Sequence, residues 1–145
     1  MYKRQTSSGR GSITGFYTIL AEGDDVNDPV ADAARAILDG HIVLSRDLAS
    51  QGHYPAIDIL PSISRVMMDI VSPEHWKIAM RLKSIVATYK KAYDLISIGA
   101  YKQGSDTKVD HAIKVIEKIN NFLRQDITEG VGFDDCLQRL FALGI

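Results

Sequence analysis

The sequence lacks the features that mark secreted, membrane-embedded and nucleic-acid-binding proteins. Its one cysteine, Cys136, cannot form a disulfide within the chain, which fits a reducing cytoplasm. No apolar run approaches the ~18 residues of a membrane span. The first five residues, MYKRQ, are too short and too polar for a secretory signal. The net charge of −1 leaves no excess of basic residues to attract nucleic acid or an anionic membrane.

A phosphate-binding loop is also missing from the sequence. In such a loop a glycine is followed by lysine and then by serine or threonine, and the backbone amides and the lysine hold the phosphates. None of the 11 glycines is followed by lysine. The four histidines show no paired metal-binding spacing such as His-Glu-x-x-His. Gly23, Asp24 and Asp25 offer carboxylates of the kind that Mg²⁺ binds, but we expect them to form a capped turn after a strand.

The composition is that of a globular protein, with 46% hydrophobic and 24% charged residues. A chain of this length suits one domain and buries roughly 70% of its unfolded surface. In the first half, residues 13–20 predict a strand buried on both faces, because they form a short apolar run rich in β-branched and aromatic residues. Residues 42–44 predict a second buried strand.

Helix signals lie between and after these predicted strands. Asp28 and Pro29 predict a helix start, and Gly40 predicts its end. Its expected apolar stripe is Val30, Ala33, Ala34, Ile37 and Leu38. Ser45 is expected to cap a short helix that ends near Gly52. The order strand, helix, strand, helix favours an α/β fold with a parallel sheet whose other strands lie upstream.

The second half predicts three helices packed as a small antiparallel bundle. Ser72, Pro73 and Glu74 form a strong start for a helix of roughly 26 residues that ends at Gly99. Asp106 caps a second helix, and residues 133–142 predict a short amphipathic third. The expected apolar faces are Ile78, Leu82, Ile85, Val86, Tyr89, Tyr93 and Ile96 on the first helix, and Val109, Ile113, Ile116, Ile119 and Leu123 on the second.

Residues 11–65 read GSITGFYTILAEGDDVNDPVADAARAILDGHIVLSRDLASQGHYPAIDILPSISR. This segment resembles the second half of the nucleotide-binding domain of flagellar and type III secretion ATPases, which are relatives of the rotary ATP synthase catalytic subunit. The resemblance continues to about residue 103 and returns at residues 122–125. It implies part of a RecA-like α/β core at residues 11–70 and a helical domain at residues 71–145, after a non-native or flexible leader at residues 1–10. It also implies that the phosphate loop, the general base and the Mg²⁺ site lie upstream, so that the chain is a C-terminal fragment.

The resemblance implies three site residues. In the family, the arginine that matches Arg65 points across the subunit boundary toward the γ-phosphate of the neighbour's ATP. A planar guanidinium suits the charge that spreads over the phosphate oxygens in phosphoryl transfer. Tyr54 matches the aromatic residue that stacks on adenine, and Pro55 stiffens the backbone there. Phe133 is a weaker candidate for the other side of the base, because an aromatic residue in a first turn more often seals the helix.

The implied function is ATP hydrolysis by a homohexamer that energises flagellar or type III protein export. This function would place the protein in the cytoplasm at the inner face of the bacterial membrane, with ATP and Mg²⁺ bound. Expected partners are a central stalk protein, export chaperone–substrate complexes and the export gate, and not nucleic acid. Residues 31–46, ADAARAILDGHIVLSR, favour the flagellar branch, but the virulence branch stays open.

Two alternatives remain from the sequence. The chain alone could be a non-catalytic helical binding module that docks export chaperones or a stalk protein, and the sequence upstream of Met1 would decide between these readings. A rotary ATP synthase-type subunit is the other alternative. In such subunits the tip of the helical hairpin is strongly acidic, whereas residues 100–106 here, AYKQGSD, carry Lys102 and only Asp106. This turn is expected to face the stalk protein in the secretion branch.

Overall fold

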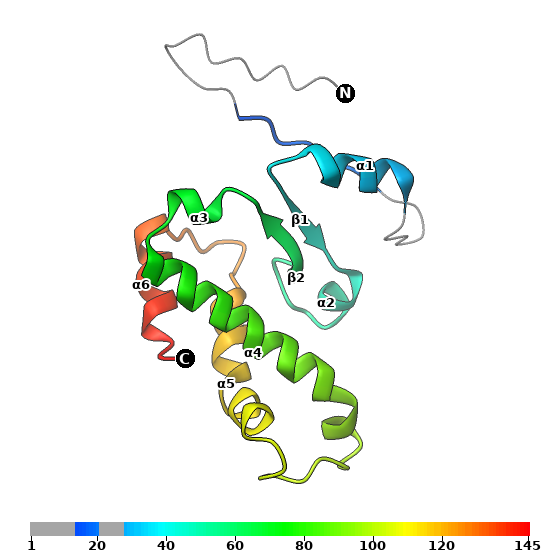
Figure 1. Ribbon diagram of the computed structural model, residues 1–145, viewed down its shortest axis with the longest axis vertical. Helices are drawn as coiled ribbons and strands as arrows, with labels where there is room; N and C mark the ends of the chain where they lie inside the picture. Colours follow the sequence, from blue (N-terminus) through cyan, green and yellow to red (C-terminus); the bar gives the residue numbers. More distant parts are fainter. Residues whose placement is uncertain (1–13, 21–27) are drawn as a thin grey trace. The chain divides into compact units, whose positions relative to one another are not determined.

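The computed structural model describes residues 14–20 and 28–145, and the chain divides into two parts between Leu38 and Asp39 (Figure 1). In the first part, α1 (Pro29–Ile37) begins where predicted: Asp28 Oδ1 accepts hydrogen bonds of 2.8 Å from the backbone N–H groups of Val30 and Ala31. Residues 14–20 are irregular and exposed. The strand predicted there is therefore wrong for these residues, because no described strand pairs with them to satisfy their backbone groups.

The other predictions for the first part have different outcomes. The stripe of α1 is wrong in detail, because Ala31 and Ala34 are its buried residues while Val30 and Ile37 are exposed. The leader at residues 1–10 and the Gly-Asp-Asp turn at residues 23–25 lie outside the described residues. The expected domain boundary at residue 70 stays a prediction.

The second part opens with an antiparallel pair of strands, β1 (Gly40–Leu44) and β2 (Ile57–Ser64), joined through α2 (Arg46–Ser50). The predicted cap of α2 is confirmed, since Ser45 Oγ accepts a hydrogen bond of 3.3 Å from the Leu48 N–H. The prediction of a buried strand is wrong: Ile42 and Leu44 are 68% and 72% exposed. Within residues 39–145, no helix or strand covers that face of the strand pair, and β2 pairs with β1 in the antiparallel sense.

The pairing of the two strands contains a large bulge. His41 and Val43 are two residues apart on β1, but their partners Ile63 and Asp58 are five residues apart on β2. Three extra residues of β2 are therefore accommodated between these pairs, where a common bulge has one. The sequence shows no strand here, because Asp58 and Pro61 interrupt the apolar pattern and Pro61 cannot donate to a ladder.

Three helices form most of the remainder: α4 (Pro73–Ser97), α5 (Thr107–Leu123) and α6 (Phe133–Ala142), preceded by the short α3 (Met67–Ile70). The predicted caps are confirmed. Ser72 Oγ accepts from the His75 N–H at 3.2 Å, and Asp106 Oδ1 accepts from the Lys108 N–H at 2.7 Å. Helix α4 has 25 residues against the roughly 26 expected from its start signal and Gly99. No described helix is long and apolar enough to cross a membrane.

The core of this part lies between α4, α5 and α6, which Figure 1 shows side by side. The predicted face of α5 is confirmed at Ile119, which is fully buried, but it is rotated in part: Ala112 and Val115 are buried, whereas Ile113 is 38% exposed. Ala112 is fully buried because its small side chain fits at the contact between two helices. The buried cluster consists of Leu82, Ile85, Ala112, Val115, Ile119 and Leu140.

The turn between α4 and α5 is held by its own side chains. Tyr101 Oη donates to Asp110 Oδ1 at 2.9 Å, and the Gly104 N–H donates to Asp110 Oδ2 at 2.9 Å. Gly99 has a φ of 71°, in the left-handed region where glycine carries no steric penalty. The hairpin therefore presents a defined tip.

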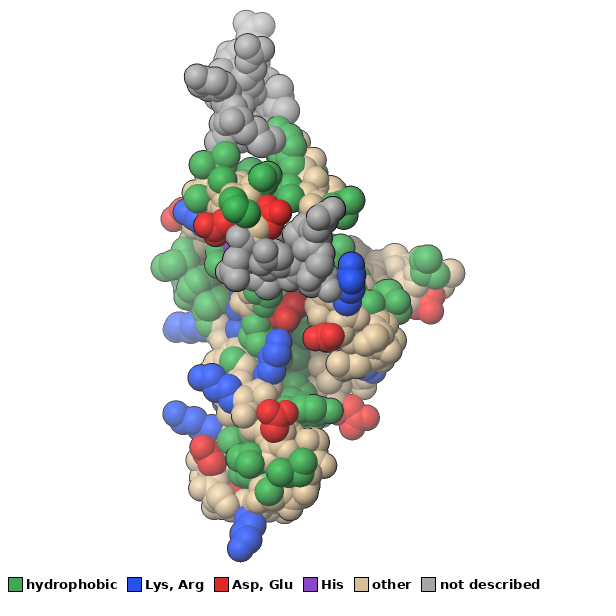
Figure 2. All heavy atoms as spheres, turned by 90° about the vertical axis from the view of Figure 1, so that its right-hand side faces the viewer, with side chains coloured by type: hydrophobic (Ala, Val, Ile, Leu, Met, Phe, Trp, Pro, Cys, Tyr) green, Lys and Arg blue, Asp and Glu red, His purple; other side chains and the backbone are tan. Residues whose placement is uncertain are grey.

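On the face that Figure 2 shows, Lys and Arg side chains are interspersed with Asp and Glu side chains.

Candidate nucleotide-binding site

Arg65 directly follows β2, at the open end of the strand pair. Its backbone N–H donates to the Asp39 carbonyl at 2.8 Å, and the neighbouring Ser64 pairs with Gly40. The strands come very close here, because a Cβ added to Gly40 would lie 2.6 Å from the Ile63 carbonyl oxygen. Arg65 is exposed. The backbone of Arg65 is thus fixed next to β1, and the residue lies at the surface, where another molecule can reach it.

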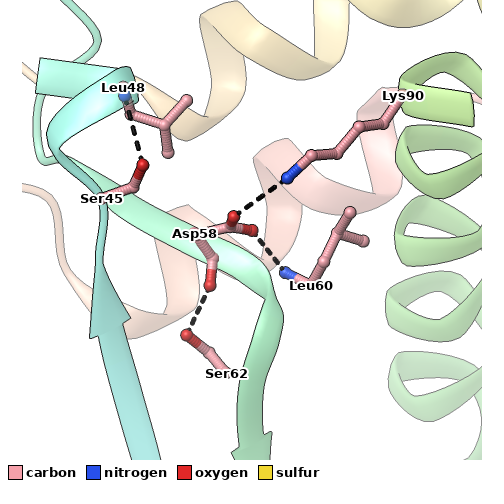
Figure 3. A network of polar contacts seen from close by, with 6 residues as sticks. All are labelled: Ser45, Leu48, Asp58, Leu60, Ser62 and Lys90. Carbon is pink, nitrogen blue, oxygen red and sulfur yellow. Dashed lines mark hydrogen bonds and ion pairs between the residues drawn. The ribbon is translucent and has the colours of Figure 1, made fainter. Parts of the chain in front are cut away.

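The bulge that precedes Arg65 is closed by a polar network (Figure 3). Asp58 Oδ1 accepts from the Leu60 N–H at 3.0 Å, and the Asp58 carbonyl accepts from Ser62 Oγ at 2.6 Å. Ser62 Oγ in turn accepts from the Val43 N–H on β1 at 3.0 Å. Side chains therefore satisfy backbone groups that the strand ladder leaves unpaired at the bulge.

Two lysines of α4 bind the same bulge. Lys83 Nζ donates to the Ser62 carbonyl at 2.6 Å. Lys90 Nζ forms an ion pair of 3.3 Å with Asp58 Oδ2, whose side chain is 19% exposed while that of Lys90 is 68% exposed. The strand that carries Arg65 is thereby attached to the helical bundle at two points.

Tyr54 lies before the other end of β2, in the turn that follows α2. Its residue is 57% exposed, so its ring is accessible to a flat ligand. Its carbonyl accepts a hydrogen bond of 2.9 Å from the Gln125 N–H, which attaches the turn to the loop between α5 and α6. The structure thus attaches the Tyr54 turn to the loop that leads to Phe133.

The loop at residues 124–132 is held by charged hydrogen bonds. Asp126 Oδ1 accepts from both the N–H and the Oγ1 of Thr128, and these bonds lower the pKa of Asp126. The Arg139 guanidinium lies 2.7 Å from Glu129 Oε1, and this contact lowers the pKa of that carboxyl. Gln125 Nε2 donates to the Glu129 carbonyl at 2.6 Å. These bonds give the loop a fixed shape beside Tyr54.

His53 lies buried directly before Tyr54, with 5% of its surface exposed. Its backbone N–H donates to the Leu48 carbonyl at 2.9 Å. Burial lowers the pKa of His53, and the charge of Arg124 lowers it further. A neutral imidazole therefore supports the Tyr54 turn from inside.

Phe133 is the first residue of α6 and is 70% exposed. Its ring lies 6.3 Å from the His75 ring, with the planes tilted by 54°. The aromatic contact that the structure gives to Phe133 is thus with the start of α4. A role of Phe133 beside a nucleotide base stays a prediction.

Arg65 and Tyr54 lie beyond opposite ends of the strand pair. Strand β1, the shorter strand with five residues, spans roughly 13 Å at about 3.3 Å per residue. The two residues are thus placed for contacts at two different edges of this part. Among the described residues, no group of three His, Cys, Asp or Glu side chains is placed to hold a metal ion.

Sequence reasoning missed the residues that support the site. Asp58, Ser62, Lys83 and Lys90 were not singled out, and His53 was considered only as a possible metal ligand. Asp58 carries a usable signal, because an aspartate side chain often accepts a hydrogen bond from the backbone N–H two residues further on and so forms an Asx turn. The lysines carried none, since they contact residues 21 and 32 positions away.

The chain is similar to known proteins along most of its length. The profile of the ATP synthase alpha/beta family, nucleotide-binding domain, matches residues 1–64, and that of the T3SS EscN ATPase C-terminal domain matches residues 71–142. The flagellum-specific ATP synthase of Pseudomonas aeruginosa is 52% identical over 136 residues, which are 94% of this chain and 30% of that protein. The type 3 secretion system ATPase of Pseudomonas syringae pv. syringae is 47% identical over 143 residues, which are 99% of this chain and 32% of that protein.

Solved structures give the same result. The assembled ATPase EscN from the type III secretion system of enteropathogenic E. coli matches with a TM-score of 0.90 and 46% identity over 97% of this chain and 34% of that one. EscN in complex with its central stalk EscO matches with a TM-score of 0.85 and 42% identity over 97% of this chain and 33% of that one. The chain therefore spans about a third of the proteins it matches. The predicted fold class, the later part of a RecA-like α/β core followed by a helical bundle, is confirmed. The chain belongs to the family of flagellar and type III secretion ATPases.

Proposed function

We propose that this chain works as the C-terminal part of a homohexameric ATPase that energises flagellar or type III protein export. Family membership supports the reaction, and the position of Arg65 supports the assembly. An exposed arginine just beyond a strand that is bonded to β1 and α4 is in a position to contact a neighbouring subunit.

The proposed role of Arg65 is to stabilise charge on the γ-phosphate of ATP bound by the next subunit. Phosphoryl transfer places negative charge on the equatorial oxygens, and a guanidinium offers several donors in one plane. Supplying the guanidinium from the next subunit makes hydrolysis depend on assembly. An arginine of this kind contributes roughly 10³–10⁵ in rate, or about 4–7 kcal/mol of barrier.

Tyr54 is proposed to stack on adenine, with Phe133 as the weaker candidate for the opposite side. The exposed Tyr54 ring and its attachment to the Gln125 loop support this role. ATP phosphates and Mg²⁺ are proposed to bind to residues outside this chain, since the sequence has no phosphate loop. The chain alone is therefore expected to show no ATP hydrolysis.

The proposed partners follow from the hairpin tip and the family. The turn at residues 100–106 has a defined shape and is proposed to contact a central stalk protein. Export chaperone–substrate complexes and the export gate are proposed as further partners, in the cytoplasm at the inner face of the membrane. The EscN structure that holds the central stalk EscO supports the stalk contact by analogy.

The test uses a full-length chimera in which this chain replaces the matching C-terminal part of the Pseudomonas aeruginosa relative. Arg65→Ala should lower kcat of the assembled chimera by roughly 10³-fold or more while ATP binding stays normal, and Arg65→Lys should recover little. Subunits with Arg65→Ala are then mixed with subunits whose phosphate loop is disabled. Mixed hexamers should regain activity where an intact loop meets an intact arginine.

Three results would contradict the proposal. The first is a chimera without substitutions that assembles but is inactive. The second is near-normal turnover of the Arg65→Ala homohexamer, and the third is verified mixed hexamers that recover no activity. The last result alone would still allow an action of Arg65 within its own subunit.

A further inference from the structure

We propose that Lys83 of α4 is a positioning residue for Arg65, with Lys90 in a lesser role: the two lysines fix the bulge of β2 and thereby the place of the guanidinium. This inference rests on the proposed function of Arg65. It assigns to the helical bundle an indirect part in phosphoryl transfer, through the position of Arg65.

Lys83 satisfies a backbone group that the strand pair cannot. The three extra residues of β2 interrupt the ladder between Asp58 and Ile63, and the Ser62 carbonyl accepts a charged hydrogen bond of 2.6 Å from Lys83 Nζ. Charged hydrogen bonds are shorter and about twice as strong as neutral ones. Ser62 lies three residues before Arg65, so a shift of its carbonyl is passed along extended backbone to the arginine.

Lys90 acts on the start of the bulge. It lies seven residues after Lys83, two turns along the same face of α4. Its ion pair with Asp58 holds the carboxylate whose other oxygen bonds the Leu60 N–H. Lys90 is largely exposed, so water weakens this pair, and its contribution should be smaller than that of Lys83.

The two contacts restrict the path of this irregular strand. A bulge of three residues allows several local backbone paths of similar length. The bonds to Ser62 Oγ and to the two lysines select one of them, and this path leaves Ser64 opposite Gly40 with Arg65 just beyond the pair. Without Lys83 the strand is expected to stay folded, because its pairing at both ends remains, but a relaxed bulge is expected to shift Arg65 slightly from its place.

The experiment measures kcat and KM of the assembled chimera for Lys83→Met, Lys83→Arg, Lys90→Met and the control Lys91→Met. Methionine keeps most of the length of the side chain and removes the charge, and Lys91 is an exposed lysine on the same helix. Lys83→Met should lower kcat roughly 10- to 100-fold, since a misplacement of about 1 Å can cost about 10²-fold. KM should change less than about twofold, because the proposed contact of Arg65 with the γ-phosphate acts mainly in the transition state.

Lys90→Met should lower kcat roughly two- to fivefold, in line with an exposed ion pair. Lys83→Arg should restore most of the activity, and Lys91→Met should have none of these effects. The decisive measurement adds Lys83→Met to Arg65→Ala. If Lys83 acts through Arg65, the double variant is no slower than Arg65→Ala alone.

The outcomes separate the two proposals. Near-normal activity of Arg65→Ala contradicts the proposed function itself. A large loss with Arg65→Ala but none with Lys83→Met contradicts only the positioning role. An equal loss from Lys83→Met with and without Arg65, or a loss of hexamers together with kcat, shows that Lys83 acts on folding or assembly and also contradicts it.

Discussion

Replacing Gly40 with alanine should displace the strand end that carries Arg65. A Cβ at this position would lie 2.6 Å from the Ile63 carbonyl oxygen and 3.3 Å from the Ser64 Cα. Both neighbours are backbone atoms, so no side-chain rotation can relieve the contact. The sequence suggests Gly40 as a helix stop, but α1 ends before it and the glycine serves the close approach of two strands.

The size of the effect follows from the overlap. Ordinary contacts of a Cβ begin near 3.4 Å, so the strands must separate by about 0.8 Å at this point. Backbone shifts of this kind typically cost about 1–3 kcal/mol. A methyl group that fits would instead stabilise the chain by about 0.4–1 kcal/mol through the unfolded state. For a domain of this size, a cost of about 1–3 kcal/mol corresponds to a melting temperature lower by about 3–10 °C.

Thermal unfolding of the isolated chain followed by tryptophan fluorescence measures this effect. Trp76 is the single tryptophan and lines a pocket together with Ile63 and Ser64, so it reports on the affected strand end. The matched control is Gly130→Ala, because no atom lies within 4 Å of the added methyl group. A melting temperature of Gly40→Ala equal to or above that of Gly130→Ala would refute the reasoning.

Three further predictions concern other parts of the structure. Tyr54→Ala in the chimera should weaken nucleotide affinity by about 1 kcal/mol with little change in kcat, as judged by fluorescent-nucleotide titration; unchanged affinity would make Tyr54 a packing residue. Scrambling residues 101–105 should abolish pull-down of the stalk protein while basal ATPase activity persists, and full-strength pull-down would contradict the contact. The chain should lose stability as the pH falls from about 7.5 to 5.5, because the lowered pKa of His53 makes the unfolded chain bind more protons below its ordinary pKa of about 6.5. His53→Gln should flatten this slope in urea titrations, and an unchanged slope would exclude His53 as its cause.

Helix starts were predictable from the sequence because their chemistry is local. Asp28, Ser45, Ser72 and Asp106 each cap backbone N–H groups two or three residues further on, so the signal and the partner lie in one short window. The three long-range features were not predictable in this way. The exposure of β1, the bulge of β2 and the rotation of α5 each depend on which surfaces meet in space.

The residues of the candidate site also divide into those with a local sequence signal and those without one. The motif around Tyr54 and Arg65 marks both residues, because their side chains lie within one recognisable segment. Lys83 contacts this segment from α4. The periodicity of α4 predicts one apolar face but gives no partner for a lysine outside that face. Arg124, whose charge bears on His53, lies just beyond the end of α5. No local pattern connects residues so far apart along the chain.

The hydrogen bond between Gln125 and Tyr54 also orders events during synthesis. The two residues are 71 positions apart, with the whole helical hairpin between them. Chains grow from the N-terminus at roughly 5–20 residues per second, so Tyr54 waits roughly 4–14 s for its partner to be made. The turn before β2 therefore gains its last support only after α4 and α5 exist. A nascent or truncated chain that stops before residue 124 has the aromatic residue but not the loop that anchors it, and is not expected to hold the base of a nucleotide firmly.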